Sequence, residues 1–501
     1  MRLSVGTKAL SIVVHFPICP SSDTMTASVK KPFLTLEDLK MCFSLFCCVY
    51  GIGTLGMPGN YARAGYGWAT VALVLMAAIN IYATWCISKV MMVAPRSIRT
   101  FGDLGEWSMG CFGRWITNIA QMLVCVMVPI MFLVLGGTIF TIMFPSSFKE
   151  TTWIIIMGLT LLPVCLIPTL KEGAGAAAAG ALGTILADGI ALGLLVHNMN
   201  EANDGLSPPH PDLSFKQVTT VFGNLALAYG AGIVVPTLQR EHSDETRMPR
   251  IIVVTLTVVS VFFLIVSITG VSVTGCQIPG NLLFAISGTK LGFQADNGGV
   301  ILSMMSMQLH ITIAFAVVMF PAFFIAERIF LGLHKTVIDR SEPAVYNDLE
   351  TPADLPEKTS ALEPIEYPSH DAASDYAAPG VYLKAAIIRI IMIIIAVVIA
   401  IAWKDHFGDL LDFVGASSTS LSCMILPIIF YLKTFWKTIR PLEKAGALFA
   451  IIICIALAIY VSINTGKVLF GSSSDGPKFP YCAPEYQNMV YTNRTYYNIT
   501  K

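Results

Sequence analysis

The sequence predicts an all-α membrane protein with about eleven membrane-spanning helices. Hydrophobic residues make up 55% of its 501 positions and charged residues only 13%, whereas charged residues form about a quarter of a soluble domain. Apolar segments of about twenty residues, the length that crosses a bilayer, follow one another along the chain. They lie near 36–62, 66–93, 114–144, 151–170, 174–196, 216–238, 250–275, 299–332, 381–403, 409–432 and 444–468.

Glycine and proline interrupt two of these segments. The first contains GIGTLGMPG, Gly51 to Gly59, and the sixth contains AYGAGIVVP, Ala228 to Pro236. Lipid offers no hydrogen-bond partner, so backbone unwinds at that depth only against protein or a polar cavity. Two sets of five helices would each begin with an interrupted helix. Interrupted helices at corresponding positions predict an inverted repeat with a binding site near the bilayer midplane, and hence a transporter.

The predicted organisation places the eleventh helix outside the repeat. Lys and Arg concentrate on the cytoplasmic side of membrane proteins, and here they concentrate in alternate loops, which places the N-terminus in the cytoplasm and the C-terminus outside. A cleaved signal peptide would conflict with the cytoplasmic start that Lys30 and Lys31 indicate. The expected parts are a cytoplasmic tail 1–35, a first five-helix repeat 36–198, a second repeat 216–433 containing a disordered cytoplasmic loop 333–380, the eleventh helix 444–468 and an outer tail 469–501.

The outer tail carries features of an oxidising, glycosylating compartment. Asn493 and Asn498 begin N-x-[ST] sequons, which are glycosylated only where the tail enters a secretory lumen. Cys276 and Cys482 are the two cysteines that this topology places outside. A disulfide between them is expected, and the alternative is two free thiols.

The two interruptions together predict a site for a zwitterion. Backbone N–H groups released at Gly51, Ile52, Gly53 and Thr54 attract an anion such as a carboxylate. Carbonyls released near the end of the first half of helix six favour an ammonium group. An α-amino acid carries both charges. The residues expected to bind it there are Ala226, Ala228, Tyr229, Gly230 and Ala231.

The side chains beside the interruptions predict a neutral substrate. Most are small and apolar, and no Arg, Lys, Asp or Glu is expected near either interruption. Tyr229 could gate the pocket or bind the substrate, or it could pack between helices as aromatic residues often do.

Polar residues inside predicted helices are candidates for ion coupling. His310 has a side chain that titrates near physiological pH and could relay a proton, or it could make one structural hydrogen bond between helices. Thr312 could offer a hydroxyl to sodium, or it could bond to its own helix backbone. Asp188 could pair with a polar group inside the bundle, and its role is open.

Three sequence stretches resemble a known family. GIGTLGMPGNYARAGY, FGNLALAYGAGIVVPTLQREHSDETRMPR and FGDLLDFVGASSTSLSCMILPIIFYLK are similar to helices one, six and ten of the amino acid/auxin permease family. The resemblance covers about Leu36 to Gly466. It implies a LeuT-type fold of the amino acid-polyamine-organocation superfamily, with two inverted five-helix repeats and proton- or sodium-coupled uptake of amino acids. It also implies that Gly51, Ile52 and Gly53 hold the substrate carboxylate and that Ala226 to Gly232 hold the amine.

Two departures from the family pattern concern the coupling ion. Sodium-coupled relatives carry Asn at the position of Cys47, and some proton-coupled relatives carry His at the position of Ser44. The motif in this sequence therefore indicates neither sodium nor proton coupling. His310 favours H⁺ over Na⁺ as the coupling ion.

The predicted function is alternating-access symport of neutral amino acids, driven by protons or sodium. A transporter-like amino-acid sensor that signals through its cytoplasmic segments would share these features. No metal-ligand cluster or nucleophile motif stands out, so neither an enzyme nor a cofactor is expected. The expected partners are an amino acid and the lipid bilayer, without nucleic acid, and a monomer is plausible. The plasma membrane and a lysosomal or vacuolar membrane both fit the outer sequons.

Overall fold

The computed structural model describes residues 32–168, 173–203, 207–287, 297–334, 376, 378–471 and 479–486. Its contacts divide the chain into Met1–Thr35 and Leu36–Lys501. The second unit carries every helix named below. Asn493, Asn498 and most of the predicted loop 333–380 lie outside the described residues.

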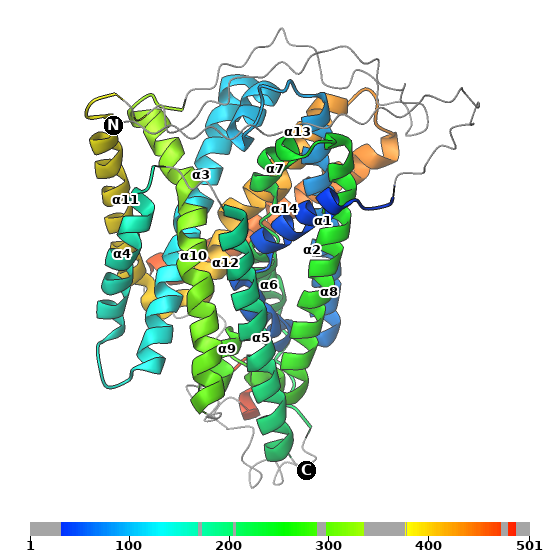
Figure 1. Ribbon diagram of the computed structural model, residues 1–501. Coiled ribbons are helices and arrows are strands. Elements are labelled where there is room, and N and C mark those ends of the chain that lie inside the picture. Colours follow the sequence, from blue (N-terminus) through cyan, green and yellow to red (C-terminus); the bar gives the residue numbers. More distant parts are fainter. Residues whose placement is uncertain are drawn as a thin grey trace, which may run out of the picture. The chain divides into compact units, whose positions relative to one another are not determined.

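The regular structure in the described residues is helical, apart from one isolated β-bridge between Pro211 and Cys482. Figure 1 shows the long helices α5, α8 and α10 running beside one another. The α-helices are α1 Leu36–Val49, α2 Met57–Val93, α3 Phe101–Met143, α4 Glu150–Leu166, α5 Gly173–Asn203, α6 Phe215–Ala228, α7 Val235–Glu241, α8 Met248–Thr274, α9 Leu282–Ile286, α10 Asn297–Phe330, α11 Val381–Trp403, α12 Phe407–Val414, α13 Leu426–Phe435 and α14 Pro441–Phe470.

Several helix starts follow from local sequence. The Ser214 hydroxyl accepts a hydrogen bond from the N–H of Gln217 at 3.2 Å and so caps α6. Thr100 caps α3 in the same way through the N–H of Asp103. Such caps satisfy N–H groups that have no acceptor within the helix.

Within the described residues, eight helices are long and apolar enough to cross a membrane, and α4 is a shorter apolar helix of 17 residues. The chain is therefore an all-helical membrane protein. Eight is fewer than the eleven predicted segments because α4 is not counted and because two helical stretches each contain residues of two segments. Ile52–Val93 has 42 residues and Val381–Phe435 has 55, whereas one crossing needs about twenty. Gly65, with φ 68°, bends the first stretch, and the 3₁₀ turn η6, Lys404–His406, lies within the second.

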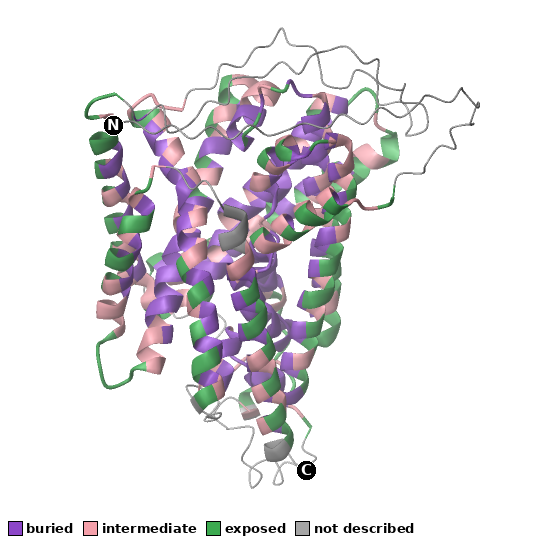
Figure 2. Cartoon of the chain, viewed as in Figure 1, coloured by how far each residue is buried: buried purple, intermediate pink, exposed green. Residues whose placement is uncertain are grey.

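Burial follows the arrangement expected in a bilayer. Figure 2 shows exposed positions along the outer sides of α8 and α11, while buried positions face neighbouring helices. Most of the exposed side chains on these two helices are Val, Ile, Leu and Phe. Apolar side chains on the outer surface suit lipid, and the buried core holds the polar groups described below.

One buried ion pair joins α4, α10 and α11. The Nε–H of Arg389 donates to Glu327 Oε1 at 2.7 Å, and Nη1 donates to the carbonyl of Ile167 at 2.7 Å. Glu327 Oε2 accepts from the hydroxyl of Tyr376 at 2.6 Å and lies 2.9 Å from Nε2 of His334. Every charge in the cluster therefore has a partner, as burial requires.

Removing one member of this cluster should destabilise the protein. Arg389→Met leaves the Glu327 carboxylate buried without its cation, so the free energy of unfolding should fall by about 3–5 kcal/mol. Lys404→Met is the control, because Lys404 pairs with the exposed Asp405, and loss of a surface pair changes stability by about 1 kcal/mol or less. Thermal unfolding of both detergent-solubilised variants checks this. Equal shifts for the two variants would contradict it.

Candidate functional site

Helix one loses its α-helical form between Val49, where α1 ends, and Met57, where α2 begins. The backbone N–H of Tyr50 still donates to the carbonyl of Phe46 at 2.8 Å. The next residue, Gly51, has a non-helical backbone, with φ −153° and ψ −141°. The chain resumes as the 3₁₀ turn η1, Ile52–Gly56, which leads into α2. The first N–H groups of a new helical turn have no acceptor within it. They are the donors that the sequence predicted for an anion.

Helix six is interrupted after α6. Its last residue is Ala228, and the carbonyl of Tyr229 accepts from the N–H of Ala231 at 2.6 Å. The 3₁₀ turn η2, Gly232–Val234, and then α7 continue the segment. The last carbonyls of a helix have no donor within it and carry the negative end of its dipole. At the end of α6, the carbonyls of Leu225 and Leu227 accept from the N–H groups of Tyr229 and Gly230.

The two interruptions touch each other. A Cβ built on Gly53 would lie 2.7 Å from both Cα and Cβ of Ala228. A Cβ on Gly56 would overlap the side-chain amide of Asn224. Only glycine permits this approach. The N–H end of η1 therefore lies beside the carboxyl end of α6.

His310 of α10 reaches the interruption of helix one. A Cβ on Gly51 would lie 3.1 Å from Cε1 and Nε2 of its ring. Nδ1 lies 3.0 Å from the carbonyl of Gly180 in α5, and because a carbonyl only accepts, Nδ1 carries the hydrogen. In the neutral ring Nε2 is then an acceptor, and it is buried without a hydrogen-bond partner in the described structure.

Asp188 of α5 also reaches helix one, which corrects the expectation that no charged residue lies near an interruption. The Tyr50 hydroxyl donates to its Oδ2 at 3.0 Å, and the Thr54 hydroxyl lies next to the same carboxylate. Asp188 is far from Gly51 in sequence, so local composition could not indicate the contact. Its Oδ1 is buried and accepts no hydrogen bond within the described residues.

Sequence reasoning missed two further polar residues at the interruptions. Asn224 is 1% exposed, and neither its Nδ2 nor its Oδ1 has a partner in the described structure. Thr419 lies in the π-helical turn η7, Gly415–Thr419, beside Gly230, and its hydroxyl is likewise buried without a partner. Both occur inside the stretches FGNLALAYG and GASSTS, where a polar residue within an apolar span was the available signal.

Polar atoms that are buried without a hydrogen-bond partner lower the stability of the protein. An unsatisfied buried polar group costs about 1–3 kcal/mol, and each such group in a native structure calls for an explanation, such as a ligand or water. Such atoms occur throughout the described structure, and five of them, from four elements, lie around the two interrupted backbones: His310 Nε2, Asp188 Oδ1, both amide atoms of Asn224 and the Thr419 hydroxyl. The arrangement can take a small polar ligand.

Two other predicted side chains, those of Thr312 and Tyr229, point away from this region. Thr312 is exposed, and its hydroxyl donates to the carbonyl of Gln308 in its own helix at 2.8 Å. It therefore makes the backbone bond that was the alternative to sodium binding. The Tyr229 side chain points to α8, with its hydroxyl 2.6 Å from Ser260 Oγ and its ring against Phe263. Ala226, Ala228 and Ala231 are buried.

A buried ion pair joins the packed helices on one side of the interruptions. Arg63 Nη1 lies 2.6 Å from Asp412 Oδ2, which joins α2 to α12. The other oxygen of Asp412 accepts from the backbone N–H of Asn224 at 3.1 Å, which connects α6 to this ion pair. The ring of Tyr481 lies 5.8 Å from the guanidinium of Arg63. Burial raises the pKa of Tyr481.

The same end of the structure carries the disulfide. Cys276 and Cys482 are joined, with 5.2 Å between their Cα atoms. The N–H of Tyr481 donates to the carbonyl of Cys276 at 3.3 Å, and the N–H of Asp212 donates to the carbonyl of Tyr481 at 3.1 Å. The tail residues are thus fixed against the segments that follow α5 and α8.

A second charged cluster lies at the opposite ends of helices one and six. Asp38, fully buried in the first turn of α1, is 2.6 Å from Arg247 Nη2 and 3.0 Å from His242 Nε2. Arg240 at the end of α7 pairs with Glu245 and donates to the carbonyls of Met91 and Ala94 in and after α2. The interrupted helices are therefore held by charge on both sides of the site.

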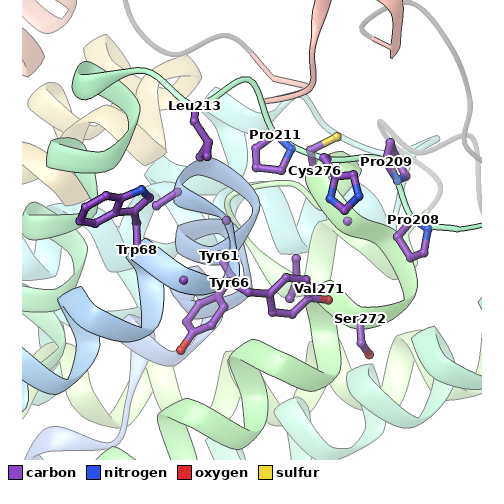
Figure 3. Close-up of a pocket in the computed structure, with 15 residues that line it drawn as sticks. Tyr61, Tyr66, Trp68, Pro208, Pro209, Pro211, Leu213, Val271, Ser272 and Cys276 are labelled. Carbon is purple, nitrogen blue, oxygen red and sulfur yellow. The ribbon is translucent and has the colours of Figure 1, made fainter.

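A separate cavity of about 540 Å³ lies near the disulfide. Figure 3 shows Tyr61, Tyr66 and Trp68 on one side of it and Pro208, Pro209 and Pro211 on the other. None of the polar groups at the interruptions lines it. Among the described residues, no group of three or more His, Cys, Asp or Glu side chains is placed to hold a metal ion.

Comparison with known proteins agrees with this geometry. The family described as "Transmembrane amino acid transporter protein" matches residues 38–467. The amino acid transporter AVT1I of Arabidopsis thaliana is 23% identical over 406 residues, which cover 79% of this chain and 86% of that protein. The amino acid transporter AVT1H of the same plant is 21% identical over 426 residues, 84% of this chain and 87% of that protein.

Solved structures share the fold at low sequence identity. The crystal structure of MhsT in complex with L-phenylalanine has a TM-score of 0.52 and 11% identity, and covers 85% of this chain and 98% of MhsT. A manganese transporter from Eremococcus coleocola also gives 0.52, with 13% identity over 87% of this chain and 88% of that one. Their likeness supports the fold, and the family match establishes kinship. The chain belongs to the family of transmembrane amino acid transporter proteins, and it is a transporter rather than an enzyme.

Proposed function

We propose that this amino acid transporter is a secondary active symporter of neutral amino acids that works by alternating access. In this proposal the chain crosses the membrane eleven times, with two inverted five-helix repeats whose first helices are interrupted. One observation carries the proposal. The N–H end of η1 meets the carboxyl end of α6 at Gly53 and Ala228, among buried polar atoms that lack partners.

This contact suits a zwitterion. A carboxylate is favoured by the free N–H groups and positive dipole end of η1. An ammonium group is favoured by the last carbonyls of α6. Buried alanines at positions 226, 228 and 231 present no charge to a substrate side chain on the helix-six side of the contact, and Asp188 is proposed to bind the coupling proton, which together support a neutral amino acid.

The two charged clusters support alternating access. Arg63 and Asp412 join helices on one side of the site, whereas Asp38 and Arg247 join them on the other. A substrate can leave only if one cluster opens. Each cluster consists of a few ion pairs that can break without unfolding a helix.

Protons are the proposed coupling ion, with sodium as the alternative. His310 and Asp188 each present one partnerless atom beside helix one, and both side chains can bind a proton.

The outward side is proposed to be extracellular or luminal, with the N-terminus in the cytoplasm. The disulfide between Cys276 and Cys482 supports this orientation, since disulfides persist in oxidising compartments. Plasma membrane and lysosomal or vacuolar membrane remain the two proposed locations.

The first test concerns the contact between interruptions. Gly53→Ala places a methyl group against the backbone of Ala228, so uptake of radiolabelled alanine into proteoliposomes should fall at least tenfold. Gly189→Ala is the matched control, because a Cβ on Gly189 meets nothing within 4 Å, and its uptake should equal that of the unaltered protein. Size-exclusion chromatography confirms that both variants are folded. Normal uptake by Gly53→Ala would remove the proposed site.

The second test concerns the driving ion. Alanine uptake should rise when the outer solution is acidic and the lumen neutral, and an imposed sodium gradient should have no effect. His310→Gln should abolish the proton stimulation while sodium-independent exchange of bound alanine persists. Stimulation by sodium alone would refute proton coupling. Binding of alanine without any uptake would favour the sensor function instead.

A further inference from the structure

The turn between α13 and α14 carries basic residues that point away from the protein. Lys433, Lys437 and Arg440 are exposed, and Lys444 is half-buried in the first turn of α14. We call these four residues the basic patch. No ion pair joins any of them to a carboxylate in the described structure. The one acidic residue in this stretch, Glu443, accepts from the Tyr431 hydroxyl at 2.8 Å.

Four arginines at this end of the helices differ from the basic patch in having carboxylate partners. Arg247 pairs with Asp38, Arg328 with Asp103, and Arg389 with Glu327. Arg240 lies against the end of α2 and pairs with Glu245. Carboxylates within the protein neutralise these arginines. No carboxylate in the described structure pairs with the basic patch, so its charge is available to a ligand.

Apolar side chains place the basic patch at a membrane surface. Trp436 is 49% exposed, and Leu442 is 85% exposed. The Nζ of Lys444 lies 4.9 Å from the centre of the Trp436 ring. On α14 just beyond the patch, Phe449 and Ile452 are also exposed, as expected of a helix face that meets lipid. Tryptophan is enriched where hydrocarbon ends and headgroups begin.

We propose that the basic patch binds the headgroup of an anionic phospholipid in the adjoining leaflet. Clusters of four or more Lys and Arg directly beside a membrane helix attract anionic headgroups, with about 1 kcal/mol from each basic residue. Four cations without carboxylate partners supply the charge, and Trp436 with Leu442 reaches the acyl region. This inference does not depend on the substrate or on the coupling ion.

The experiment measures lipid binding directly. Protein in uncharged detergent is titrated with dansyl-labelled phosphatidylserine, and energy transfer from tryptophan reports binding. Dansyl-labelled phosphatidylcholine should bind much more weakly. The triple variant K433Q/K437Q/R440Q should bind phosphatidylserine roughly a hundredfold more weakly, at about 1 kcal/mol for each residue removed. High salt should weaken binding by the unaltered protein, because exposed charges are screened.

Three controls make each outcome decisive. K433R/K437R/R440K keeps the charge and should keep the affinity, and K149Q/K216Q/K404Q removes three lysines elsewhere and should also keep it. Equal binding of the two lipids by the unaltered protein would overturn the proposal, as would unchanged binding by the K433Q/K437Q/R440Q variant. Soluble glycerophosphoserine is the last control. If it competed at the same concentrations as the lipid, the ligand would be a soluble phosphate rather than a membrane lipid. None of these measurements involves alanine, so failure here leaves the transport proposal standing.

Discussion

The close approach of Gly53 to Ala228 is the contact on which the rest of the site depends. An interrupted helix inside a bilayer must bury its free backbone groups against protein or a polar ligand. Here two interruptions bury theirs against each other, and glycine makes this possible because a Cβ would overlap the facing backbone. The positive end of one half-helix and the negative end of another are thereby fixed side by side.

The surrounding helices complete this arrangement with polar side chains that lack partners. His310 from α10 and Asp188 from α5 approach helix one, while Asn224 lies one turn before Ala228 on α6. Leaving such groups unsatisfied lowers stability. Five of these atoms lie beside the two interruptions, where a small zwitterion could supply the missing hydrogen bonds, and this supports the proposed binding site.

Charge holds the interrupted helices at both ends without filling the site. Arg63 and Asp412 are buried together, as are Asp38 and Arg247. A buried pair is costly to break by removal of one partner, yet a concerted movement that carries both partners into water regains their hydration. This property agrees with the proposal that the two clusters open in turn.

Much of this site could be predicted from sequence because its backbone is unusual locally. The glycines at Gly51 and Gly53 and the stretch at Ala228 mark the interruptions directly. The approach of Asp188 and the missing bonds of Asn224 could not be predicted, since they depend on which faces of α5 and α6 turn inward. The α-helix is interrupted at the predicted Gly51 to Thr54, and the detail that the sequence did not indicate is the 3₁₀ turn η1, in which the N–H of Thr54 donates to the carbonyl of Gly51.

The charged contacts on either side were also beyond sequence reasoning. Arg63 and Asp412 are separated by most of the chain and pair only because α2 and α12 meet. The direction in which Thr312 points was also not evident from sequence. Its hydroxyl makes the backbone bond that was the alternative to sodium binding, because Thr312 is exposed while His310, two residues before it on the helix, is buried.

The most direct measurement is an experimental structure of the protein with bound alanine. The account predicts the alanine carboxylate within hydrogen-bond distance of the N–H groups of Ile52 and Gly53, and its ammonium group on the last carbonyls of α6. Density for alanine elsewhere, such as in the cavity beside Trp68, with no ligand at Gly53, would contradict the account.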